Sequence, residues 1–247
     1  MGSSSSTSND PNSLGNAYRD QGRLPEAETM YIQALARREK ELGAEHSLTL
    51  DTVNNLGVIY CKQGKLDQAL LMYMRALAGR TNTLGAHHFL TLETITNVGI
   101  LYCMQGRIGE SEHIFKELLA IREESLGAHH ILTLDTLQNL GNVYYAQRKL
   151  EEARHLYIRA LVGKEKVLGP NHVSTLDTVF NLANVYCDQR KYEQAEPMYL
   201  RALTGSGELL GPKHPSTVET VKKLMSVYRF QGRPDKAKQL EQNWLHV

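Results

Sequence analysis

Hydrophobic positions return along this chain every 42 residues, the spacing from Leu14 to Leu56. An aliphatic residue opens each copy of the pattern, and a tyrosine follows it by four positions. The two columns are Leu14, Leu56, Val98, Leu140, Leu182 and Leu224, and Tyr18, Tyr60, Tyr102, Tyr144, Tyr186 and Tyr228. Repeats of this length are supersecondary units that bury their apolar faces only by stacking on neighbours. The pattern therefore predicts an α-solenoid.

Each repeat contains two stretches with helical spacing. In residues 43–84, an apolar stripe at i, i+3, i+4 and i+7 predicts a first helix, the A helix, at about 48–62. Gly64 supplies the left-handed residue that ends it, and a second stripe predicts a B helix at about 66–83. The small residues Gly57 and Ala69 should let the two helices approach closely.

The expected fold is thus all-α, a right-handed superhelix of stacked antiparallel helix pairs. We expect one array over residues 11–247, with repeats at about 11–42, 43–84, 85–126, 127–168, 169–210 and 211–247, the first of them shortened. Asp10 should cap the first helix, with Pro11 in its first turn.

Residues 1–10 are polar and low in complexity, which predicts a disordered leader. Met1-Gly2 with Ser6 formally matches an N-myristoylation start. The favoured interpretation is a flexible leader or an expression remnant, because one acyl chain without basic support anchors weakly.

Composition narrows the classes of partner. Lys and Arg total 28 against 27 Asp and Glu, a net charge of +1, so we expect neither a nucleic acid nor an acidic membrane as partner. No apolar run reaches the roughly 18 residues of a membrane span, and no secretion signal is visible. Cys61, Cys103 and Cys187 share one repeat column and should be too far apart for disulfides. Reduced thiols favour a cytoplasmic location.

The pattern N-L-G-x-x-Y-x-x-Q-G followed by x-x-A-x-x-x-Y-x-x-A-L resembles the tetratricopeptide repeat. Those repeats usually have about 34 residues. The longer unit here, with its L-G-x-x-H-x-x-T-L-x-T linker, is similar to the repeats of kinesin light chains, and to arrays in fungal nucleotide-dependent receptors. No heptad coiled coil or nucleotide-binding domain accompanies it, so the parent protein stays open. The resemblance implies that the A helices line a concave groove for extended peptides.

The free face of the A helices supplies the candidate groove residues. They are Asp51, Asn54, Asn55, Val58, Lys62, Glu93, Asn97, Ile100, Asp135, Gln138, Asn139, Asn142, Tyr145, Asp177, Phe180, Asn181 and Asn184. One column in this set is all asparagine: Asn55, Asn97, Asn139 and Asn181. An amide both donates and accepts hydrogen bonds, so it can pair with a peptide backbone of any sequence. The alternative is that each asparagine bonds to a neighbouring helix.

An acidic row lies beside the asparagines: Asp51, Glu93, Asp135, Asp177 and Glu219. It favours a basic segment with apolar anchors that meet Ile100, Tyr145 and Phe180. Alternatively, these acids only complement the helix dipoles in the early turns.

The histidine column His46, His88, His130, His172 and His214 is better explained by helix capping than by a metal, because residues one repeat apart cannot converge on one zinc ion. We find no catalytic constellation and expect no metal and no cofactor. The sequence favours a non-catalytic scaffold that binds a protein or an extended peptide. The alternative is a structural element that self-associates through its end faces or groove.

Overall fold

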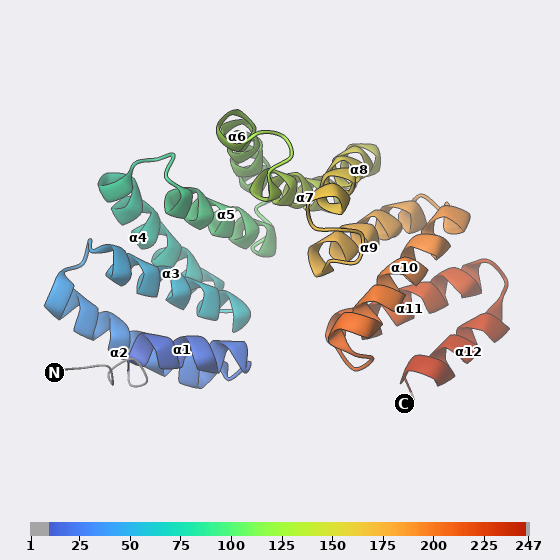
Figure 1. The fold of residues 1–247 in the computed structure, drawn as a ribbon, viewed down its shortest axis with the longest axis horizontal. Helices are drawn as coiled ribbons and strands as arrows, with labels where there is room; N and C mark the ends of the chain where they lie inside the picture. The colour runs from blue at the N-terminus through green and yellow to red at the C-terminus, as the bar shows by residue number, and fades with distance from the viewer. Residues whose placement is uncertain (1–9, 246–247) are drawn as a thin grey trace. The chain divides into compact units, whose positions relative to one another are not determined.

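The computed structural model describes residues 10–245, and twelve α-helices without any strand form the regular structure of this part of the chain. The chain divides into two compact units, Met1–Ile114 and Phe115–Val247. The predicted fold class, a stack of antiparallel helix pairs, is confirmed within each unit (Figure 1). One continuous array over 11–247 stays a prediction, and residues 1–9, with the myristoylation motif, lie outside the described residues.

The first unit holds α1 to α5 and the start of α6. The helices are α1 (Pro11–Asp20), α2 (Leu24–Leu42), α3 (Ser47–Lys62), α4 (Leu66–Leu84), α5 (Phe89–Met104) and α6 (Ile108–Leu126). The odd-numbered helices are the A helices, and α3 contacts both its hairpin partner α4 and the next A helix α5. Gly57 lies against the ring of Tyr73, so close that an added Cβ would come within 2.5 Å of it. This confirms the close approach predicted from the small residues.

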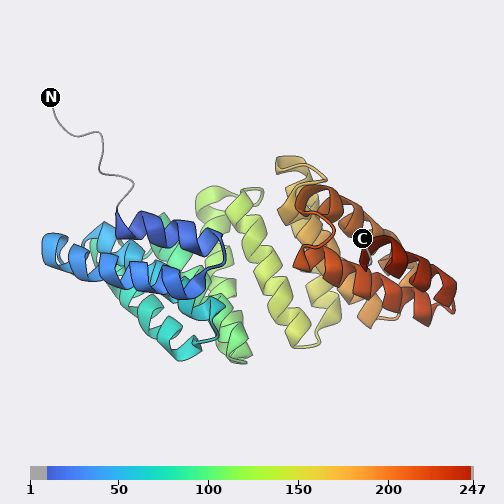
Figure 2. The same cartoon turned by 90° about the horizontal axis from the view of Figure 1, so that it is seen from below.

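The second unit continues the same alternation. Its helices are α7 (Ile131–Ala146), α8 (Leu150–Val167), α9 (Val173–Asp188), α10 (Tyr192–Leu210), α11 (Pro215–Phe230) and α12 (Pro234–Leu245). Each helix packs on the next one along the chain, and the turned view shows this stacking within the unit (Figure 2). Tyr157, Val179 and Leu182 lie in its core, each almost fully buried.

Histidine side chains start the A helices, as the sequence predicts. Each Nδ1 accepts a hydrogen bond from the backbone N–H two residues later, at 3.2 Å for His46 and 3.3 Å for His214. His88, His130 and His172 repeat this contact. The capping prediction is therefore confirmed. Asp10 also caps α1, because its carboxylate accepts from the backbone N–H of Ser13.

Candidate functional site

The A helices place the predicted groove residues of the first unit on α3 and α5. Lys62, Glu93 and Ile100 are exposed, whereas Asp51, Asn55, Val58 and Asn97 are half-buried. Asn54 differs from this set, because only 6% of its surface is exposed. Its Oδ1 accepts a hydrogen bond of 3.3 Å from Nδ2 of Asn97. Asn54 thus joins α3 to α5.

In the second unit the predicted residues lie on α7 and α9, and two of them have a structural role. Asn142 accepts a hydrogen bond of 2.7 Å from the Tyr157 hydroxyl, and Asn184 accepts one of 2.6 Å from the Tyr199 hydroxyl. Both tyrosines belong to B helices, so these asparagines fasten the A helix to its partner. Asn139 and Asn181 are half-buried on the open face.

The asparagine column keeps free hydrogen-bonding capacity in both units. Asn97 and Asn181 each donate one bond of 3.3 Å to an asparagine of the preceding A helix. Among residues 10–245, no group donates to the side-chain oxygen of Asn55, Asn97, Asn139 or Asn181. Bonding to a neighbouring helix therefore uses one amide hydrogen at most and leaves every carbonyl oxygen available.

The apolar candidates differ in what they offer a ligand. Ile100 is 40% exposed in the first unit. In the second unit, Phe180 is half-buried and packs edge-on against Tyr199, with the ring centroids 5.7 Å apart. The Tyr145 hydroxyl donates to the Asp188 carboxylate at 2.9 Å. Burial, together with that bond, raises the pKa of Tyr145 to about 12, so the phenol stays protonated at neutral pH.

The acidic row is partly neutralised from within the protein by buried cations on the B helices. Arg80 of α4 is only 3% exposed, and its Nη2 lies 2.6 Å from Oδ1 of Asp51. Its Nη1 donates to the Leu90 carbonyl at 2.9 Å and to the Thr94 hydroxyl at 2.7 Å. One arginine therefore ties the acidic row of α3 to the start of α5.

Lysine takes this place in the second unit. Lys164 of α8 is fully buried and lies 2.8 Å from Oδ1 of Asp135. Its ammonium also donates to Gln138 at 2.6 Å and to Ser174 at 2.8 Å. The column reads Arg38, Arg80, Arg122, Lys164 and Ser206, 42 residues apart. The sequence-based reasoning missed these cations, although their spacing was the signal that could have found them.

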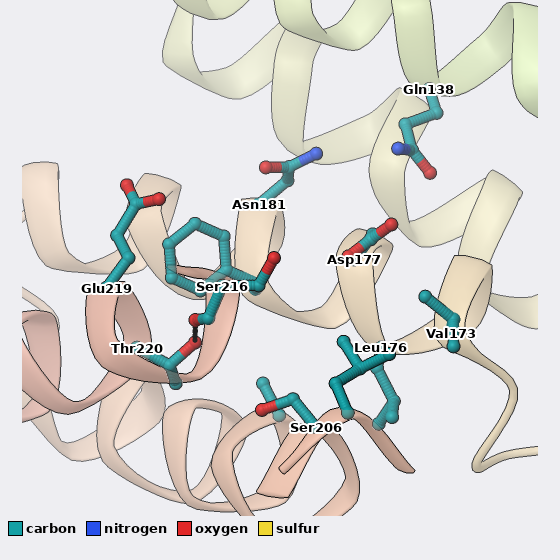
Figure 3. A pocket seen from close by; sticks show the side chains of 12 residues that line it. Gln138, Val173, Leu176, Asp177, Asn181, Ser206, Ser216, Glu219 and Thr220 are labelled. Atoms are coloured by element: carbon teal, nitrogen blue, oxygen red, sulfur yellow. Dashed lines mark hydrogen bonds between the residues drawn. The ribbon is translucent and has the colours of Figure 1, made fainter. Parts of the chain in front are cut away.

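Where the column reaches Ser206, the second unit has a pocket of about 290 Å³ (Figure 3). Its lining comes from α7, α9, α10 and α11: Gln138, Val173, Leu176, Asp177, Phe180, Asn181, Ala202, Ser206, Leu210, Ser216, Glu219 and Thr220. Four of the predicted groove residues thus meet here with Glu219 of the acidic row: Gln138, Asp177, Phe180 and Asn181. The pocket walls partly desolvate the carboxylate of Asp177 and raise its pKa, although the residue keeps contact with solvent.

Residues 10–245 contain no group of three His, Cys, Asp or Glu side chains that could hold a metal ion. In the same part of the chain, no helix combines the length and the apolar character needed to cross a membrane. The thiols of Cys61, Cys103 and Cys187 are free.

Comparison with known proteins identifies the repeat. A model of the tetratricopeptide repeat matches residues 5–82, 52–124, 90–166, 136–204 and 173–242. A sequence search of curated proteins gives no match.

Several solved structures are similar in fold. One is described as the nearly identical TPR-like repeats of a putative kinesin light chain from Podosopora anserina; it is 22% identical, with 81% of this chain and 94% of that chain covered and a TM-score of 0.65. BtubC (BKLC) from P. vanneervenii is 19% identical, with 91% and 89% covered and a TM-score of 0.72. NprR in complex with its cognate peptide NprX is 16% identical, with 94% and 64% covered and a TM-score of 0.69.

Proposed function

Because the chain belongs to the tetratricopeptide repeat family, we propose that it is a non-catalytic scaffold that binds an extended polypeptide on the face of its A helices. This fold commonly serves protein interaction, and the solved structure of NprR, which shares it, contains a cognate peptide. The A helices contact one another directly, α3 with α5 and α7 with α9, which supports a binding face that extends over neighbouring A helices within each unit.

The free carbonyl oxygens of Asn55, Asn97, Asn139 and Asn181 carry this proposal. If the side-chain oxygen of each asparagine accepted a hydrogen bond from a neighbouring helix, no acceptor would remain for a ligand. Here each unit presents two acceptors at equivalent positions of adjacent A helices, where the N–H groups of an extended backbone can reach them. Because backbone groups are common to all sequences, these contacts hold a bound peptide of any sequence. Preference for a particular peptide sequence must come from the side chains around the asparagines.

Apolar and charged groups beside the asparagines would select the sequence of the bound peptide. Ile100 in the first unit and Phe180 in the second offer apolar contacts. The attraction of the acidic row for a basic ligand should be weak at Asp51 and Asp135, because Arg80 and Lys164 already neutralise these carboxylates. A preference for basic residues should therefore concentrate at the last two A helices.

Selection from a library of random displayed peptides, followed by titration of a recovered peptide, tests the proposal. The variant Asn139→Ala with Asn181→Ala should bind about tenfold more weakly, because two backbone hydrogen bonds of about 0.5–1.5 kcal/mol each are lost. Gln194→Ala, an exposed amide at the start of the B helix α10, is the matched control and should bind like the wild type. Binding that ignores the asparagine pair, or that Gln194→Ala weakens equally, would contradict this function.

A further inference from the structure

The pocket lies at Ser206, the one position without a cation in the column Arg38, Arg80, Arg122, Lys164 and Ser206, here called the cation column. Arg38, Arg80, Arg122 and Lys164 hold the preceding positions, and each points its charge at the start of the following A helix. Serine is too short to do so. Its hydroxyl donates to the carbonyl of Leu203, within its own helix.

The groups that receive the cation elsewhere are all present around Ser206. Arg80 contacts Asp51, Glu93, the carbonyl of residue 90 and the hydroxyl of Thr94. Adding three repeats of 42 residues gives their counterparts Asp177, Glu219, Ser216 and Thr220. All four line the pocket, and Figure 3 shows them around the same hollow with Ser206 at its base.

The two carboxylates and the hydroxyl among these counterparts still lack the donor that the cation supplies in other repeats. Among the residues that the structure describes, no side chain donates to the carboxylates of Asp177 or Glu219. Thr220 is only 3% exposed, and its hydroxyl donates to the Ser216 carbonyl. In the equivalent Thr94 the hydroxyl makes the same bond to the Leu90 carbonyl and also accepts from Arg80. The acceptor side of the Thr220 hydroxyl is therefore a buried site that its repeat equivalents Thr52, Thr94 and Thr136 fill with a guanidinium.

The mouth of the pocket opens on the A-helix face, because Asp177 and Glu219 are exposed while Ser206 and Thr220 are buried at the base. Its volume of about 290 Å³ is far larger than the ~30 Å³ share of one water molecule in the liquid. A side chain with a planar cationic head can therefore enter from the face on which we place the polypeptide.

We propose that this pocket binds the guanidinium of an arginine in the bound polypeptide, an inference that rests on the proposed function. The guanidinium would take the place that Arg80 occupies in the first unit, between a carboxylate, a hydroxyl and a backbone carbonyl. Three of the four filled positions in the column hold arginine, whose planar fork serves several acceptors at once, whereas a lysine ammonium acts as a compact charge.

The test uses short alanine peptides with blocked ends and one central residue, which is arginine, lysine or citrulline. Citrulline keeps the shape of arginine without its charge. Binding is followed by NMR shifts of the backbone amides of Asp177 and Thr220. The arginine peptide should bind at least about tenfold more tightly than the citrulline peptide, as the loss of charge-assisted hydrogen bonds predicts. N-acetyl-arginine amide should give the same shifts, since the guanidinium is the group recognised.

Two variants of one helix separate pocket filling from a general charge effect. Ser206→Arg should place a guanidinium of the protein itself in the pocket and raise the melting temperature. It should also weaken binding of the arginine peptide at least about tenfold. Thr204→Arg adds the same charge at an exposed position of α10 and should leave binding within about twofold. Asp177→Asn should weaken binding of the arginine peptide and leave binding of the citrulline peptide unchanged. Circular dichroism checks that each variant is folded.

The outcomes distinguish the pocket from the wider function. If the arginine and citrulline peptides bind alike, or if Ser206→Arg leaves binding unchanged, the pocket does not take a guanidinium, even where library peptides still depend on the asparagines. If the arginine probes shift the pocket amides while library peptides ignore the asparagine pair, the pocket is supported and the groove function fails. If neither the probes nor the library peptides bind, both proposals are wrong.

Discussion

Replacing Arg80 by methionine should destabilise the protein far more than the same replacement at Arg75 of the same helix. Methionine retains an apolar stem and removes the charged head with its contacts to Asp51, Leu90 and Thr94, which lie at 2.6, 2.9 and 2.7 Å. Removing one partner of a buried ion pair costs about 3–5 kcal/mol. Because the Asp51 side chain is 36% exposed and can be solvated, we expect about 3 kcal/mol, the lower end of that range.

Arg75 provides the matched control. It pairs with Glu39, and the two side chains are 34% and 38% exposed, so the pair is worth about 0–1 kcal/mol. Urea unfolding at neutral pH, followed by circular dichroism, gives both losses from the shift of the midpoint, and hydrogen exchange should show faster opening of α4 and α5 only in Arg80→Met. Equal losses, or a loss at Arg80 below about 1 kcal/mol, would refute the view that the buried cation column holds successive repeats together.

Three further changes probe the packing and the pocket. Leu140→Ala truncates a side chain that is 4% exposed and should cost about 2–5 kcal/mol in urea unfolding, whereas Leu14→Ala, at a half-buried position, should cost clearly less. Gly141→Ala places a Cβ within 2.7 Å of the Tyr157 ring and should lower the melting temperature, because overpacking of about 1–3 kcal/mol exceeds the gain in helix propensity of about 1 kcal/mol. The pKa of Asp177 is raised in the folded protein, so ionisation of this carboxyl lowers the stability of the fold. This penalty is absent below the unfolded pKa of about 3.9 and complete above the folded pKa. Asp177→Asn should therefore stabilise the protein at pH 7 and leave its stability unchanged near pH 3.

The regular part of the fold could be predicted from the sequence because it repeats. The A helix expected at 48–62 is Ser47–Lys62, and the B helix expected at 66–83 is Leu66–Leu84. The histidine caps were also predictable, since a side chain just before a helix has few other roles. Division into two units was not predicted, because the 42-residue pattern runs through residues 114 and 115 without a break.

The candidate site was harder to predict because its residues come from both helices of a repeat. A helical wheel of α3 places Asp51 on the free face, but it cannot show Arg80 of α4 reaching across to pair with it. The acidic row therefore looked more uniform than it is. The pocket at Ser206 depends on what one residue lacks, and this becomes visible only when the contacts of the filled positions are known.

Mapping where a polypeptide lies tests the central claim most directly. A peptide recovered from the library is titrated into isotope-labelled protein, and the shifts of the backbone amides are assigned along α7 to α10. We predict that the largest shifts fall on the A helices α7 and α9, around Asn139 and Asn181. Shifts concentrated on the B helices α8 and α10, with the asparagine amides unmoved, would contradict binding on the A-helix face.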